Sequence, residues 1–73
     1  VKNIISAVNM LDDEFKTVIV LRDMEGMEYK EISDITGLPL GTVKSRLSRG
    51  RGKLRQMIEK FNLKPETEGR GRA

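Results

Sequence analysis

One stretch of the chain decides its fold: Pro39-Leu40-Gly41-Thr42-Val43-Lys44-Ser45-Arg46-Leu47-Ser48-Arg49. If each residue advances about 100° around a helix, this stretch has two distinct sides. One side is apolar and fits a core-facing stripe, made of Leu40, Val43, Leu47 and, further on, Leu54. The other side combines small residues with cations, Gly41, Ser45, Ser48, Arg49 and Gly52, with Lys44 at its edge.

The second side of this helix is suited to a polyanion. Small residues let another surface come close, and long cations attract negative charge. The major groove of DNA is wide enough to admit an α-helix of this kind. Charge alone, however, is equally typical of an ordinary solvated surface.

Length and composition narrow the function classes. With 73 residues the chain forms one small domain at most, so its core is marginal and every apolar stripe is needed. The absence of cysteine and histidine removes disulfides, thiolate metal sites and histidine-based catalysis. No apolar run approaches the roughly 20 residues of a membrane span, and no signal peptide is visible in a chain that starts at Val1 like a cut fragment. We expect no enzyme activity, no cofactor, no metal and a cytoplasmic location.

Charge is distributed unevenly along the chain. Residues 1–37 carry four basic and eight acidic side chains, whereas residues 38–73 carry ten basic and three acidic ones. Such asymmetry indicates a basic half that faces a ligand and an acidic half that serves as scaffold.

Helical spacing predicts an all-α, small helix-turn-helix domain of about four helices over residues 1–62. The first helix is expected at 2–9 and the third at 28–36. The second is expected to begin after Asp12, which serves as its N-cap. Residues 18–21 also favour a strand, but the acidic start and Gly26 stop favour helix. Gly37 fits a left-handed cap, so a turn leads into a long recognition helix at 40–61. Residues 63–73 are predicted to be a disordered tail.

The predicted core follows the same periodicity. Gly50 lies on the apolar side of the last helix, where it would allow close packing, and the ring of Tyr29 is expected to pack inward. The core residues are expected to be Val18, Ile32, Ile35, Val43, Leu47 and Leu54. Four further apolar residues pack internally or line a groove for a partner helix, and the pattern leaves the choice open: Phe15, Met57, Ile58 and Phe61.

Two separated motifs resemble a known family. The segments are 21–32 (LRDMEGMEYKEI) and, after Gly37, 41–47 (GTVKSRL). In order and spacing they are similar to region 4, the C-terminal domain of bacterial sigma factors, and most of all to the extracytoplasmic-function group. The chain departs from the family pattern at Asp12, where proline is usual, at Ser33, where alanine is common, and at Thr36, where an aliphatic residue is usual. The Ser33 hydroxyl must therefore find a partner at a tight helix contact.

The resemblance implies a function and three partners. Region 4 reads the promoter −35 element while the sigma factor is bound to core RNA polymerase. It also docks on the flap of the polymerase β subunit, and in many relatives an anti-sigma factor covers it. We therefore expect a DNA-binding transcription initiation factor that acts at the nucleoid.

The helical wheel and the family resemblance together predict the residues of the site. The expected base-reading residues are Lys44, Ser45, Ser48 and Arg49, with Arg49 the best candidate for a bidentate contact to guanine. Backbone amides near Gly41 and Thr42 lie at a helix N-terminus, where anions bind, and Arg46 reaches the flanking backbone. Arg22, Tyr29 and Lys30 match family positions that clamp phosphates. Arg51, Lys53 and Arg55 would only strengthen the positive electrostatic field that attracts DNA.

Two alternatives stay open at this stage. The first is the DNA-binding domain of a LuxR-type response regulator, which would act as a dimer on paired half-sites. The second is a protein-interaction domain whose basic face binds an acidic partner, chiefly an anti-sigma factor.

Overall fold

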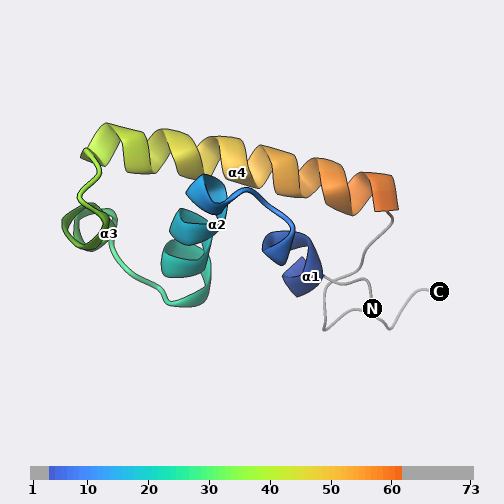
Figure 1. Cartoon of the computed structure of the whole chain (residues 1–73), viewed down its shortest axis with the longest axis horizontal. Helices are drawn as coiled ribbons and strands as arrows, with labels where there is room; N and C mark the ends of the chain where they lie inside the picture. The colour runs from blue at the N-terminus through green and yellow to red at the C-terminus, as the bar shows by residue number, and fades with distance from the viewer. Residues whose placement is uncertain (1–3, 62–73) are drawn as a thin grey trace.

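The computed structural model describes residues 4–61, which fold into helices joined by short turns (Figure 1). In chain order these elements are α1 (Ile4–Asn9), α2 (Asp13–Ile19), the π-helical turn η1 (Val20–Met24), α3 (Tyr29–Thr36) and α4 (Leu40–Phe61). The predicted all-α class with a long last helix is confirmed. The predicted tail at 63–73 and the first residues of the chain lie outside the described residues.

The second helix begins and ends where its sequence requires. Asp12 takes the extended N-cap conformation, and Asp13 and Glu14 occupy the first turn, where the helix dipole favours negative charge. The chain passes from α2 directly into η1, so residues 18–21 are helical and not a strand. The helical segment ends at Met24, and Gly26, two residues later, takes a left-handed φ of 75°.

The turn between α3 and α4 is fixed by side-chain hydrogen bonds. Gly37 adopts the predicted left-handed conformation, with φ 77°. The Ser33 hydroxyl donates to the Leu38 carbonyl at 2.6 Å, so the hydroxyl that replaces the usual alanine does find a partner. The Thr36 hydroxyl donates to the Ile32 carbonyl at 2.7 Å and accepts the Leu38 amide at 3.2 Å. Both departures from the family pattern therefore support the turn.

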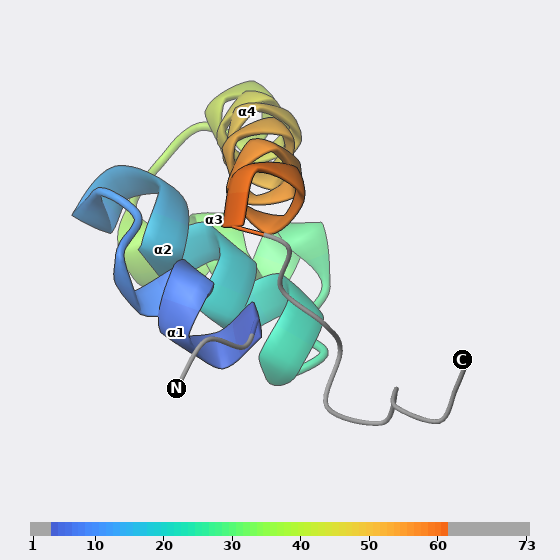
Figure 2. The same ribbon diagram turned by 90° about the vertical axis from the view of Figure 1, so that its right-hand side faces the viewer.

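Helix α4 is the common support of the domain. It crosses above α3, α2 and α1 in Figure 1, and Figure 2 shows the three shorter helices gathered on one side of it. The buried core lies between α4 and this group, and comprises Ala7, Val8, Leu11, Phe15, Val18, Ile19, Ile32, Val43 and Leu47.

Close packing of α4 depends on one glycine. Gly50 is buried, as predicted, and a Cβ atom placed on it would lie 2.8 Å from Ile19 Cδ1 and 3.1 Å from Phe15 Cβ. These distances are shorter than ordinary van der Waals contacts. The absence of a side chain at position 50 therefore lets α2 lie directly against α4.

The prediction that Ile35 faces the core is wrong, because its side chain is 64% exposed. On a helical wheel of α3, three half-buried residues all lie to one side of the fully buried Ile32. Ile35 lies to the opposite side of Ile32. These three residues are Tyr29, Ser33 and Thr36. Helix α3 has α4 and η1 as its neighbours, so only one of its flanks is covered.

The apolar stripe of α4 is also shorter than predicted. Leu40 is 43% exposed, whereas the neighbouring Leu38, in the turn, packs against the core in its place. Leu54 lies half-buried against the core. At the other end of α4, Phe61 is 51% exposed. The core therefore covers the middle of α4 and leaves the apolar residues at its two ends partly in solvent.

Candidate nucleic-acid interface

The side chains predicted to read bases share the solvent face of α4. Lys44, Ser45, Ser48 and Arg49 are all exposed, while Val43 on the same helix is fully buried. Because α4 is rigidly seated on the core by Val43 and its neighbours, the exposed residues have a fixed angular placement. The predicted division of α4 into two faces is therefore present in the folded domain.

Arg49 differs from most other cations of α4 because no neighbour holds it. Among residues 4–61, Arg49 and Arg55 are the two α4 cations without an ion pair or ring contact. The held cations are Lys44 (Nζ 5.7 Å from the Tyr29 ring centre), Arg46 (with Glu14), Arg51 (with Asp23), Lys53 (5.6 Å from the Phe15 ring) and Lys60 (5.6 Å from the Phe61 ring). Arg49 can therefore bind a ligand without giving up a partner.

The two serines of the face differ in their local bonding. The Ser45 hydroxyl donates to the Thr42 carbonyl one turn earlier, at 3.2 Å. Ser45 therefore keeps its oxygen lone pairs as acceptors for a base amino group. Ser48 is exposed one turn further along the helix.

The start of α4 offers fewer free amides than its sequence predicts. The Pro39 carbonyl accepts the Thr42 amide at 2.9 Å and the Val43 amide at 3.0 Å. The Thr42 amide is thus already used inside the helix. A phosphate at this end would have to use the Gly41 amide and the Thr42 hydroxyl.

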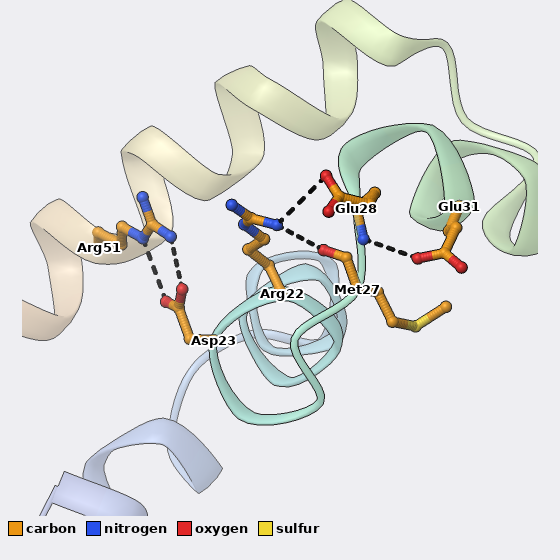
Figure 3. A network of polar contacts seen from close by, with 6 residues as sticks. All are labelled: Arg22, Asp23, Met27, Glu28, Glu31 and Arg51. Carbon is orange, nitrogen blue, oxygen red and sulfur yellow. Dashed lines mark hydrogen bonds and ion pairs between the residues drawn. The ribbon is translucent and has the colours of Figure 1, made fainter.

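Arg22 and Tyr29 lie together at the junction of η1 and α3. The Arg22 guanidinium carbon is 4.7 Å from the centre of the Tyr29 ring, which gives a cation–π contact. Arg22 Nη1 also donates to the Met27 carbonyl at 2.7 Å and lies 4.0 Å from Glu28 Oε1 (Figure 3). Arg22 therefore holds the loop before α3 in addition to any contact with a ligand.

Two more predicted phosphate ligands have acidic neighbours. Lys30 is exposed and lies 3.9 Å from Asp34, one turn along α3. Arg46 is half-buried and lies 3.9 Å from Glu14 of α2. Both pairs are single ion contacts at 3.9 Å, beyond hydrogen-bond distance, and such pairs contribute at most about 1 kcal/mol, so a phosphate can compete for either cation.

One pair of the site was not predicted from the sequence. Arg51 of α4 binds Asp23 of η1 in a fork: Nε donates to Oδ2 at 3.1 Å and Nη2 donates to Oδ1 (Figure 3). The hydrogen bond from Arg51 to Asp23 is the main cause that raises the pKa of the guanidinium above its usual value. The partners are 28 residues apart, so no local spacing signals the pair.

A hollow lies at the other end of α4, away from the predicted DNA face. It is lined by apolar residues of α4 and of the turn between α1 and α2, with cations beside them. Its lining comprises Met10, Leu11, Asp12, Lys53, Gln56, Met57, Lys60 and Phe61. Of the residues whose packing the sequence leaves open, Phe15 is buried, Met57 packs on the core and also borders this hollow, and Phe61 lies at its edge.

Residues 4–61 contain neither a cluster of metal-binding side chains nor a helix that could cross a membrane. No group of three or more His, Cys, Asp or Glu side chains could hold a metal ion there. None of the helices described is long and apolar enough to cross a membrane.

Comparison with known proteins matches the sequence of this chain to one family. The family model of sigma-70 region 4 matches residues 2–54. An extracytoplasmic-function (ECF) sigma factor SigE of Mycolicibacterium smegmatis is 46% identical over 57 residues, which are 78% of this chain and 22% of the relative. An ECF sigma-E factor of Haemophilus influenzae is 36% identical over 56 residues (77% and 30%), and SigW of Bacillus subtilis is 44% identical over 48 (66% and 26%).

The extent of these matches settles the choice between the candidate families. The chain spans between a fifth and a third of the length of these relatives. The match to sigma-70 region 4 includes the segment from Arg22 to Ile32 as well as α4 up to residue 54. The chain belongs to the sigma-70 region 4 family.

Proposed function

We propose that this chain binds the promoter −35 element as the DNA-reading domain of a sigma factor, which directs core RNA polymerase to promoters. Its family consists of non-enzymatic initiation factors, so the proposal concerns recognition and not catalysis. The observation that carries it is Arg49, an exposed cation with no ion pair or ring contact among residues 4–61, which lies among small residues on a helix packed against the core. We place this activity in the cytoplasm, at the nucleoid.

In this proposal α4 enters the major groove with Ser45, Ser48 and Arg49 toward the bases. The Arg49 guanidinium donates two parallel hydrogen bonds to O6 and N7 of a guanine. The Ser45 hydroxyl, which donates its hydrogen to the Thr42 carbonyl, accepts from a base amino group, and the Ser48 hydroxyl donates to or accepts from a neighbouring base edge. Lys44 reaches a base from the edge of the face after leaving the Tyr29 ring.

Phosphate contacts fix the position of α4 in the groove but carry no sequence information. We assign them to Gly41, Thr42 and Arg46 of α4 and to the junction of η1 and α3. At this junction Arg22, Tyr29 and Lys30 face one strand of the backbone. Since Tyr29 holds both Arg22 and Lys44, its ring aligns a phosphate ligand with a base reader.

A binding selection on randomised duplexes, followed by a salt titration, tests the proposal. The full chain is tethered to the polymerase flap for the selection, because an isolated domain binds weakly without such positioning. Fluorescence anisotropy then compares the selected duplex with a scrambled duplex of the same composition at several salt concentrations. We expect tighter binding of the selected duplex at moderate salt. Equal affinity for both duplexes would disprove sequence-specific reading.

For the protein partners, we propose that the hollow at the C-terminal end of α4 accepts the β flap or an anti-sigma factor. Its apolar lining by Met10, Met57 and Phe61 supports this assignment. Changing Phe61 to Asp should weaken binding to the isolated flap and leave duplex affinity unchanged. Loss of duplex affinity alone would place the partner surface elsewhere.

A further inference from the structure

We propose that Asp23 limits the sequence-independent DNA affinity of this domain by holding Arg51 away from the phosphate backbone. The inference rests on the proposed function, because it takes α4 as the helix that approaches DNA. It assigns a regulatory role to an acidic residue outside the predicted site.

The Asp23–Arg51 pair imitates a phosphate contact. The carboxylate accepts from both Nε and Nη2 of Arg51 (Figure 3). A guanidinium forks onto a phosphate through the same two parallel hydrogen bonds. Asp23 therefore occupies two of the five N–H donors of Arg51, those of the Nε–Nη2 edge that would otherwise fork onto a phosphate.

The position of Arg51 places it beside the groove. It follows Lys44 by seven residues, so it lies within about 20° of Lys44 on the wheel and about 10 Å further along the axis. Its side chain is 43% exposed and that of Asp23 is 38% exposed. Both groups are thus accessible at the edge of α4, where the backbone of a bound duplex would run.

Release of Arg51 from Asp23 would change the affinity for every duplex equally. A free Arg51 would add one phosphate contact, which raises affinity for any sequence and leaves discrimination between sequences unchanged. The Asp23 carboxylate also repels nearby phosphates. By keeping general affinity low, the pair leaves the domain dependent on Arg49 and its neighbours, and on polymerase, for stable binding.

Salt titrations of Asp23→Ala and Asp23→Asn test the inference on selected and scrambled duplexes. Each added phosphate contact makes the slope of log K against log salt steeper by about 0.9. Between 50 and 200 mM salt, affinity should therefore fall about 3.5-fold more for Asp23→Ala than for the wild type. We expect tighter binding of both duplexes at low salt by the same factor.

Two controls separate the release of Arg51 from other effects. Glu25→Ala removes the same charge two residues away and should leave the slope unchanged. Asp23→Ala combined with Arg51→Gln should return the slope to the wild-type value. If Asp23→Ala leaves the salt slope unchanged, as Glu25→Ala should, or lowers both duplex affinity and thermal stability, the pair only stabilises the fold and the inference is wrong.

Arg51→Gln alone gives an independent test if Asp23→Ala does not fold. It should leave the slope unchanged, because Arg51 does not contact DNA in the wild type. A slope shallower by about 0.9 would show that Arg51 already binds a phosphate and would overturn the inference. A wild type that does not distinguish duplexes would refute the −35 proposal alone, since the slopes are measured on any duplex.

Discussion

At the scale of single residues, Gly50 and Arg49 lie in opposite environments although they are adjacent on α4. Gly50 is buried against Ile19 and Phe15, and Arg49 is exposed without a partner among residues 4–61. Gly50 thus fixes the helix, and the preceding residue, Arg49, is the proposed contact to DNA. The two roles are separable by mutation because one affects unfolding and the other affects binding.

Gly50→Ala is expected to destabilise the domain by about 1–3 kcal/mol, because an added methyl overpacks the contact with α2. The matched control is Gly52→Ala on the same helix, where a Cβ atom would meet nothing within 4 Å. This control should gain up to about 1 kcal/mol from helix propensity. Urea denaturation followed by circular dichroism measures both changes. A stabilised Gly50→Ala variant would contradict the packing described for Ile19 and Phe15.

Arg49→Ala should cost about 1–3 kcal/mol of binding free energy on the selected duplex and relax preference at one base pair. Arg22→Ala should instead weaken all duplexes about equally and make the salt slope shallower. Anisotropy on duplexes with single base changes measures the preference. If Arg22→Ala altered base preference, the roles assigned to these two arginines would be wrong.

At the scale of elements, the turn between α3 and α4 decides how the recognition helix is presented. Gly37 reverses the chain in a left-handed conformation, and Ser33 bonds the Leu38 carbonyl across the turn. The turn is thus held by α3 itself.

Ser33→Ala should lower the free energy of unfolding by about 0.5–1.5 kcal/mol, since the Leu38 carbonyl loses its donor. Ser48→Ala is the control, because its exposed hydroxyl supports no turn; it should leave stability within about 0.5 kcal/mol. Thermal unfolding at one salt concentration compares the two. Equal stabilities would mean that Gly37 alone maintains the turn.

The elements were predictable from the sequence to the extent that local chemistry controls them. The glycine at 37 and the apolar spacing of 40–61 predict the turn and α4 correctly. Ile35 was placed wrongly because periodicity defines a face of a helix but not which flank a neighbour covers. Pairs such as Asp23–Arg51 escaped prediction because they depend on how η1 and α4 pack, which no local spacing encodes.

At the scale of the whole molecule, folding and DNA binding should respond differently to salt. The core is apolar, with no buried polar or charged residue among those described, and each ion pair of residues 4–61 has at least one exposed partner. Surface pairs contribute at most about 1 kcal/mol each and are screened by salt. DNA affinity, by contrast, depends on phosphate contacts.

Raising salt from 50 to 200 mM should therefore change the melting temperature by only a few degrees while duplex affinity falls many-fold. Thermal unfolding and anisotropy in the same buffers measure the two quantities. A parallel loss of both would mean that charge pairs hold the fold, against the apolar core described for the domain.

The exposed face of α4 also has an evolutionary consequence. Ser45, Ser48 and Arg49 make no core contact, whereas Val43, Leu47 and Gly50 of the same helix are buried. Selection can thus exchange these proposed base readers one at a time while the scaffold stays under separate constraint. Under the proposed function, a lineage carrying this fold can acquire new target sequences without passing through unfolded intermediates, so its regulatory repertoire can diversify at little cost in stability.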